Sequence, residues 1–239
     1  IKVLTGQLAP AAGRVRVAGY DLESEFHKIK PLFGYVPDFD NHFEEFTAEE
    51  NLRFYCGLYG ADPKGVDDVL ARVELSAEKK NKVRAFSKGM KKKLSLAREM
   101  LHHPKILYLD EPTANLDVHS TQNVRRMLMG MRDQGTTVFV TTHNMEEAEE
   151  VCDRIAIIDH GKVVEVNSPL MFKAAHTENL VDVVYDEDGK ERRVTLKMSL
   201  AADRERLAGL IASGQLLTIH SKEFNFKQVF LKLTGREFN

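Results

Sequence analysis

Short apolar runs typical of strands alternate with segments of helical periodicity across residues 25–159. Within one such segment Val124, Met127, Leu128 and Met131 recur at i, i+3, i+4 and i+7, which predicts a helix that Gly135 ends. The β-branched run at 137–141 predicts the strand that follows. This alternation is typical of a parallel sheet covered by helices. The other predicted strands are 14–17, 33–37, 106–109 and 154–159, and the other predicted helices are about 25–30, 47–59, 87–102 and 145–152. The helix at 47–59 begins at a capping box formed by Thr47 and Glu50.

A different pattern begins after Ser168 and Pro169. Two apolar runs, 181–185 and 193–196, flank Asp188-Gly189, a dipeptide typical of a tight hairpin turn. The sequence then predicts a helix at 200–213, a strand at 216–220 and a helix at 226–233. We therefore expect a small α+β extension over residues 168–239, after a main α/β domain over residues 1–167.

Composition limits the classes of protein to which the chain can belong. Its 239 residues suffice for one large domain, or for one domain with a small appendage. The formal net charge of −2 gives no general attraction to nucleic acid, and no nucleic-acid partner is expected. No apolar run approaches the roughly 18 residues that span a bilayer. Cys56 and Cys152 are the only cysteines, so we do not expect a disulfide framework. We expect a reducing, cytoplasmic setting instead. A membrane role would come through a partner.

Two adjacent carboxylates follow the apolar run at residues 106–109. Burying each of its large side chains contributes roughly 1.5–3 kcal/mol, whereas placing Asp110 and Glu111 at the strand end is costly unless a cation or hydrogen-bond donors meet them. A magnesium ion and a polarised water would meet that need in nucleotide hydrolysis. The alternative is a solvated strand end.

Ser87 precedes a predicted helix whose first two turns hold four lysines. Ser87 alone would be explained as an N-cap, worth about 1 kcal/mol. Positive charge opposes the helix dipole there, so we expect something anionic at this end. A phosphate bound by exposed backbone N–H groups, Ser87 and the close-approaching Gly89 would fit, and a solvated basic face is the alternative. The lysines are Lys88, Lys91, Lys92 and Lys93.

Four motifs in this order resemble those of ABC-type ATPases. They are Phe86-Ser-Lys-Gly-Met90 (signature motif), Leu107-Tyr-Leu-Asp-Glu-Pro112 (Walker B), Ala114-Asn-Leu-Asp117 (D-loop) and Thr141-Thr-His143 (switch histidine). The tail at residues 229–237 is similar to the C-terminal extension of daunorubicin-resistance exporter ATPases. The resemblance implies a P-loop NTPase-like fold with a helical subdomain at about 47–103.

The resemblance also implies roles for single residues. Asp110 would hold Mg²⁺ through water, Glu111 would activate the attacking water, and His143 would contact the γ-phosphate of ATP. Ser87, Lys88 and Gly89 would bind the ATP held by a second ATP-binding subunit, and Asp117 would bridge the two subunits. From the residues alone, His143 could be a structural histidine and Asp117 a plain helix cap. Transmembrane permease subunits would hold the chain at the inner face of the cell membrane.

The chain departs from the family pattern in two places. No Gly-x-x-x-x-Gly-Lys-Ser/Thr loop occurs, and residues 1–6 look like the helix turn after such a loop. We read this as truncation and expect the polypeptide as given not to bind ATP in the usual way. Asp38 stands where the family usually has glutamine; it could still attract the metal, or be an ordinary loop residue. The nearby Phe39, Phe43 and Phe46 are expected to dock a partner's cytoplasmic helix.

The favoured function is therefore ATP binding and hydrolysis coupled to transport, in the export direction. A non-catalytic ABC-like regulatory module would explain the absent loop but not the retained Asp110, Glu111 and His143. A soluble ABC ATPase acting on ribosomes or DNA usually has two ATPase domains or long insertions, and neither is present. The transported substrate cannot be read, because membrane subunits would select it.

Overall fold

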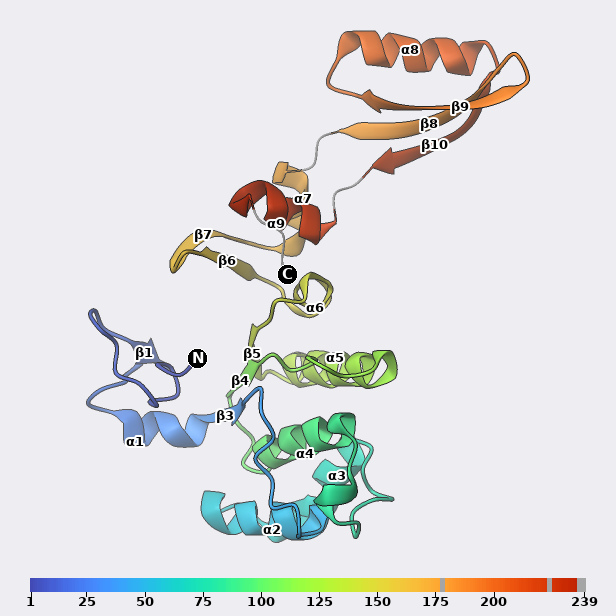
Figure 1. Cartoon of the computed structure of the whole chain (residues 1–239). Helices are drawn as coiled ribbons and strands as arrows, with labels where there is room; N and C mark the ends of the chain where they lie inside the picture. The colour runs from blue at the N-terminus through green and yellow to red at the C-terminus, as the bar shows by residue number, and fades with distance from the viewer. Residues whose placement is uncertain (177–178, 223–224, 236–239) are drawn as a thin grey trace. The chain divides into compact units, whose positions relative to one another are not determined.

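The computed structural model describes residues 1–176, 179–222 and 225–235, and the chain divides into two compact units, Ile1–Val151 and Cys152–Asn239. We describe each unit by itself (Figure 1). The expected domain boundary at residue 167 stays a prediction. The end of the tail motif, residues 236–237, lies outside the described residues.

A three-stranded parallel sheet forms the centre of the first unit, in the order β3-β4-β5. The strands are β3 (Phe33–Val36), β4 (Ile106–Asp110) and β5 (Thr137–Thr141). Val36 pairs with Leu109 and Asp110 pairs with Thr141, so the carboxyl ends of all three strands reach the same edge of the sheet. The predicted α/β class with a parallel sheet is confirmed, because β3 pairs with β4 and β4 with β5 in parallel. The central strand β4 buries its three central side chains, as its apolar run requires.

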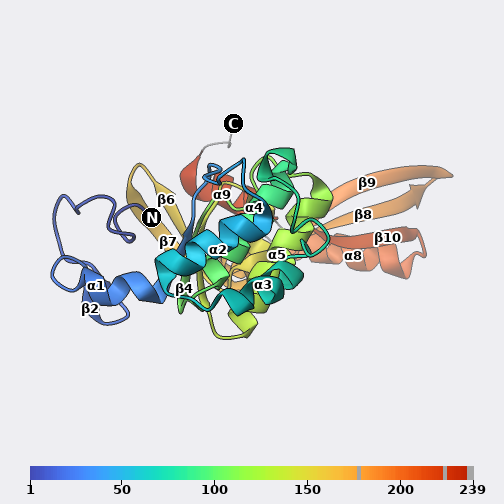
Figure 2. The same ribbon diagram turned by 90° about the horizontal axis from the view of Figure 1, so that it is seen from below.

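Helices α2, α3 and α4 pack against one another within this unit (Figures 1 and 2). α2 begins at the predicted capping box, in which Thr47 Oγ1 accepts from the Glu50 N–H at 3.1 Å. Their core includes Leu52, Leu70 and Leu94, all fully buried. The helices of this unit are α1 (Phe26–Ile29), α2 (Ala48–Tyr59), α3 (Val66–Arg72), α4 (Lys88–Met100), α5 (Val118–Asp133) and α6 (Met145–Val151), with short 3-10 turns at Lys30–Leu32, Pro63–Gly65 and Val83–Ala85.

The first residues have the hydrogen bonds of a helix end, as expected, with the Gly6 N–H bonded to the Val3 carbonyl at 3.0 Å and the Gln7 N–H to the Lys2 carbonyl at 2.9 Å. Residues 2–6 form successive turns, with the Thr5 N–H bonded to the Ile1 carbonyl at 3.0 Å, and Gly6 takes a positive φ of 71° that ends them. The predicted strand at 14–17 begins two residues later and ends at Val17 as expected, because Ala18 and Gly19 both have positive φ and turn the chain into a hairpin. That hairpin pairs β1 (Arg16–Val17) with β2 (Tyr20–Asp21).

A buried ion pair fastens α4 to the neighbouring segments. Arg98 Nε donates to Glu99 Oε1 at 2.7 Å, and both side chains are almost fully buried. Glu99 Oε2 accepts from the Tyr35 N–H at 3.2 Å, and Arg98 Nη1 donates to Asn41 Oδ1 at 2.7 Å. The pair therefore holds β3 and the chain that follows it against α4.

The second unit is α+β, as predicted for the C-terminal extension. Its larger sheet is antiparallel in the order β10-β8-β9, and Asp188 and Gly189, both at positive φ, make the predicted hairpin turn. The elements are β6 (Ile155–Asp159), β7 (Lys162–Asn167), α7 (Pro169–His176), β8 (Leu180–Glu187), β9 (Lys190–Lys197), α8 (Ala201–Ala212), β10 (Leu216–Lys222) and α9 (Phe226–Thr234).

One prediction for this region is wrong. The sequence predicts that the strand at 154–159 belongs to the parallel sheet, but β6 instead forms an antiparallel hairpin with β7. His160 and Gly161, both at positive φ, supply the tight turn that brings the next strand back alongside it.

Candidate functional site

Glu111 and His143 meet at the carboxyl edge of the parallel sheet. Glu111 Oε1 accepts from the His143 backbone N–H at 3.0 Å, and Oε2 lies 2.8 Å from His143 Nδ1. Glu111 has a φ of +48°, uncommon for a residue with a side chain, and its N–H donates to the Thr141 carbonyl at 2.9 Å. The end of β5 thus holds the backbone turn that aims the Glu111 carboxylate at His143. The two predicted catalytic residues are therefore in direct contact with each other.

Asp110 and Asp38 lie at the ends of adjacent strands. Asp110 Oδ1 accepts from Thr141 Oγ1 at 2.6 Å, which orients that carboxylate, and Asp38 follows β3 by two residues. Burial, together with the negative charges of Asp110 and Asp38, raises the pKa of the Tyr35 hydroxyl. Because both acids act on the same phenol, they share one local environment at this edge.

These carboxylates suit magnesium chemistry. Within residues 1–176, 179–222 and 225–235, no group of three or more His, Cys, Asp or Glu side chains forms a preformed metal site. Mg²⁺ is usually bound by one or two carboxylates together with water and substrate phosphates, so two acids at a strand edge fit it without a third protein ligand. Asp110 and Asp38 are the residues that could hold it.

Ser87 caps α4, as the sequence predicts. Its Oγ accepts from the Met90 N–H at 3.2 Å, and the side chain is exposed. The lysines that follow mostly find partners inside the chain, contrary to our expectation of an outside anion. Lys91 pairs with Glu44 and Lys93 with Glu74, each at 2.7 Å.

Lys92 is buried and donates to the Pro37 carbonyl at 3.0 Å. Of the four lysines, only Lys88 lacks such a partner in the described part of the chain. The argument from charge at this helix start is therefore weaker than the sequence suggested, and the case for phosphate binding depends on the exposed helix start at Ser87 and Lys88, since Gly89 is buried.

Gly89 brings the start of α4 against the start of α5. A Cβ at Gly89 would lie only 2.9 Å from Ser120 Cβ, and closer still to Ser120 Oγ. Ser120 in turn donates its backbone N–H to Asp117 Oδ1 at 2.9 Å and its hydroxyl to Oδ2 at 2.7 Å, so Asp117 is an N-cap. These hydrogen bonds lower the pKa of Asp117. The close contact explains why a residue without a side chain stands at this position.

The structure joins the predicted residues into two groups. Glu111, His143, Asp110 and Asp38 lie at the sheet edge, and Ser87, Lys88, Gly89 and Asp117 lie at the starts of α4 and α5. Sequence reasoning missed Thr141 as a partner of Asp110, Ser120 as the contact of Gly89, and Lys92 as a buried cation. Thr141 could have been found, because it is the last residue of the strand that borders Asp110; the other two contacts are long-range and leave no local pattern.

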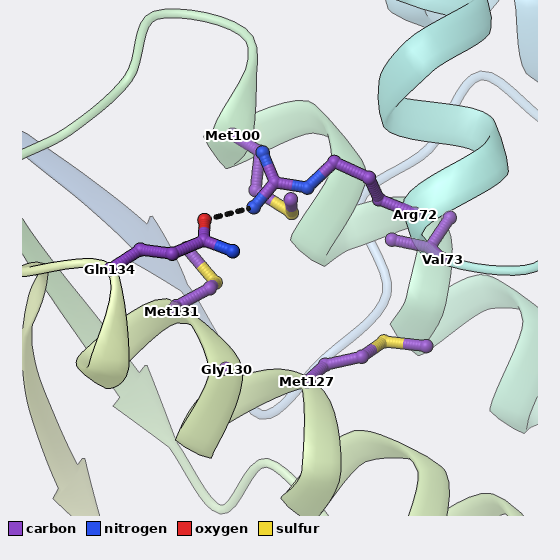
Figure 3. Close-up of a pocket in the computed structure, with 7 residues that line it drawn as sticks. All are labelled: Arg72, Val73, Met100, Met127, Gly130, Met131 and Gln134. Carbon is purple, nitrogen blue, oxygen red and sulfur yellow. Dashed lines mark hydrogen bonds between the residues drawn. The ribbon is translucent and has the colours of Figure 1, made fainter.

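A methionine-lined pocket of about 180 Å³ lies elsewhere in the first unit (Figure 3). Its walls come from the carboxyl ends of α3 and α4 and from the second half of α5, with Arg72 Nη2 donating to Gln134 Oε1 at 2.8 Å. Ser87 and Asp117 cap the opposite ends of α4 and α5. The pocket is therefore separate from the candidate site. Its methionines are Met100, Met127 and Met131.

An aromatic patch is exposed on α2 and the loop before it. Phe43 is central: its ring centroid lies 4.8 Å from that of Phe54 and 5.2 Å from that of Phe46. Asn51 of α2 holds the loop in place, because its Oδ1 accepts from the Phe43 N–H at 3.0 Å. The aromatic patch consists of Phe43, Phe46 and Phe54, and Phe39, earlier in the same loop, is exposed as well. None of the helices in the described ranges is both long and apolar enough to traverse a bilayer.

Comparison with known proteins agrees with this geometry. Residues 1–114 match the family model described as ABC transporter. The chain is 34% identical to a fluoroquinolones export ATP-binding protein of Mycobacterium tuberculosis, over 99% of this chain and 79% of that protein. It is 30% identical to the linearmycin resistance ATP-binding protein of Bacillus subtilis, over 99% of this chain and 85% of that protein.

Solved structures give the same result. The structure of an ATP-binding subunit of an ABC transporter superposes with a TM-score of 0.64 at 25% identity, covering 73% of this chain and 74% of that one. The curated relatives align over nearly the whole of this sequence, so the likeness extends beyond the motifs of the first unit. This chain belongs to the ABC transporter family, as an ATP-binding subunit.

Proposed function

We propose that this protein binds and hydrolyses ATP to drive export through separate membrane subunits. The observation that carries the proposal is the paired contact of Glu111 with His143 at the strand end that also holds Asp110. The relative named for export of fluoroquinolones supports the direction of transport.

In this proposal Glu111 orients the attacking water and accepts its proton. His143 lies within reach of both Glu111 oxygens and would contact the terminal phosphate while keeping the carboxylate aimed. Asp110, oriented by Thr141, and Asp38 would hold Mg²⁺. When bound, that ion would neutralise charge developing on the transferred phosphoryl group.

A second copy or a related ATP-binding subunit would complete each site. Ser87, Lys88 and Gly89 of the neighbour would meet the phosphates through backbone N–H groups at the start of α4, and Asp117 would lie at the boundary between subunits. The N-cap geometry supports this role, because Ser87 and Lys88 are exposed at the helix start and Ser87 accepts from the Met90 N–H alone among the described residues.

The aromatic patch would receive the permease. Exposed rings that pack on one another and rest on a hydrogen-bonded loop offer a firm apolar surface for a partner's helix. Docking there would hold the subunit at the cytoplasmic face of the membrane.

The decisive experiment measures ATP hydrolysis by the full-length protein reconstituted with its permease. The variant Glu111→Gln should lower kcat at least about a hundredfold while nucleotide binding persists, because the base is lost but the binding groups are not. Glu146→Gln, an exposed glutamate on α6, is the matched control and should retain activity. Absence of hydrolysis by the wild-type complex, or equal activity of Glu111→Gln, would favour a non-catalytic regulatory module instead.

A further inference from the structure

Lys92 is a buried cation that connects two parts of the first unit. It lies on α4, five residues after Ser87, and its side chain is only 5% exposed. Its Nζ donates to the Pro37 carbonyl at 3.0 Å, directly before Asp38. A charge-assisted hydrogen bond in a buried setting is stronger than a neutral one. The helix that starts at the signature motif is therefore bonded to the segment that carries a candidate metal ligand.

Acids from three other segments lie near enough to act on the charge of this ammonium group. Burial is the largest effect and lowers the pKa of Lys92, although the negative charges of Asp40, Asp38, Asp110 and Glu147 act in the opposite direction. Glu147 on α6 is fully buried, and both its carboxylate oxygens lack a hydrogen-bond partner within the described residues. A buried carboxylate without hydrogen-bond partners is costly, and the positive charge of Lys92 acts on Glu147 in the favourable direction.

We propose that Lys92 is a positioning residue that makes α4 and the carboxyl edge of the sheet move as one body. The idea depends on the proposed function for the roles of Ser87 and Asp38. In the two-subunit arrangement, Ser87 of this chain would serve the neighbour's nucleotide, whereas Asp38 and Asp110 would serve its own. Lys92 would therefore link the two composite sites within a single subunit.

Neighbouring lysines do not share this position. Lys93 is on the same helix and also lies close to an acid, but it pairs with Glu74, away from the sheet edge, and that acid is mostly exposed. Lys93→Met therefore removes the same charge from α4 without touching Pro37, and it is the matched control. Lys92→Met keeps the length of the side chain but loses its charge and its donor.

The first measurement is the kinetics of ATP hydrolysis by the full-length protein with its permease. For Lys92→Met we expect kcat to fall at least about tenfold and KM for ATP to change less than about threefold, because the acids are misplaced while the phosphate contacts remain. Lys92→Arg, which keeps a donor and a charge, should recover kcat to within about threefold of wild type. Lys93→Met should stay within about twofold of wild type.

The second measurement does not require hydrolysis. Hydrogen–deuterium exchange of peptides covering residues 37–46 should be at least about threefold faster in Lys92→Met than in wild type or Lys93→Met, because the bond from α4 to Pro37 is lost while the contacts of α4 with Asn41 and Glu44 remain in all three proteins. Lys92→Gln is used in both measurements if Lys92→Met does not fold, with the same expectations.

The outcomes separate the two hypotheses. Unchanged exchange in residues 37–46, a kcat within twofold of wild type, or an equal loss in Lys93→Met would each overturn the role of Lys92. If the wild-type complex itself hydrolyses no ATP, the proposed function fails, and the exchange measurement alone then decides whether the link exists.

Discussion

Glu111 bonds to His143 at two atoms, through its Oε1 to the backbone N–H and through its Oε2 to ring Nδ1. The first bond fixes where the chain leaves β5, and the second fixes the ring. Neither side chain can change its orientation without disturbing the other, so the two residues form one functional unit.

A double-mutant cycle tests this unit. We expect Glu111→Gln and His143→Ala each to lower kcat at least about a hundredfold, and the double variant to be no slower than the slower single variant, because groups that act together lose their effect together. Steady-state ATPase rates of the full-length protein with its permease supply the four values. Effects that multiply would show that the two residues act separately.

Gly89 should not tolerate a side chain. The methyl group of Gly89→Ala would press on Ser120, so the free energy of unfolding should fall by about 1–3 kcal/mol. Gly57 is the control, since it is exposed within α2 and an added Cβ meets nothing within 4 Å. Gly57→Ala should raise stability by about 0.5–1 kcal/mol. Urea unfolding measures both, and equal signs for the two variants would contradict the close contact.

His42 should make the stability depend on acid pH. Its Nε2 lies 2.9 Å from the Lys91 carbonyl and 3.0 Å from Ser95 Oγ, and burial lowers its pKa from 6.5 to about 4. Between pH 6.5 and about 4, His42 is therefore protonated in the unfolded chain but neutral in the folded chain. This contribution is complete above pH 6.5 and is lost as the pH falls toward 4, by about 3 kcal/mol at most.

The variant His42→Gln should flatten the dependence of the unfolding free energy on pH between 6.5 and 4. Urea titrations at several pH values measure the slope. His27→Gln, at an exposed position of α1, should leave the slope unchanged. A slope in His42→Gln equal to that of wild type would assign the pH dependence to other groups.

Charging the aromatic patch should weaken attachment to the permease. Phe43→Glu places a carboxylate among the rings, and we expect at least about tenfold weaker association, since a central apolar anchor is lost. The Asn51 bond involves only the Phe43 backbone, so the melting temperature should change little. Co-purification and binding titration with the detergent-solubilised permease test this. Tyr20→Glu, an exposed aromatic in β2, is the control, and equal loss in both would contradict a specific surface.

The elements that the sequence predicted well have strong local signals. Thr47 and Ser87 were identified as caps because the acceptor and the N–H it meets are three residues apart. β4 and β5 were identified because their apolar and β-branched runs are continuous. The strand at 154–159 was placed in the wrong sheet, because the partner of a strand depends on the turn that follows and on distant chain.

The candidate site shows the same division. Asp110, Glu111 and His143 were found from the strand ends, which are local features. The partners of the lysines on α4 were missed, because Glu44 and Glu74 are 47 and 19 residues away and nothing in the adjacent sequence indicates them.

The buried pair of Arg98 and Glu99 has a consequence for how such sequences diverge. Losing either charge alone would leave the other buried and unpaired. The free energy of unfolding would then fall by typically about 3–5 kcal/mol, about a third or more of a domain's whole stability. Single replacements at either position should therefore be removed by selection, whereas simultaneous exchange for two apolar residues would be tolerated. Descendant lineages should keep both ionic partners or neither, a joint inheritance visible in any sufficiently deep collection of relatives.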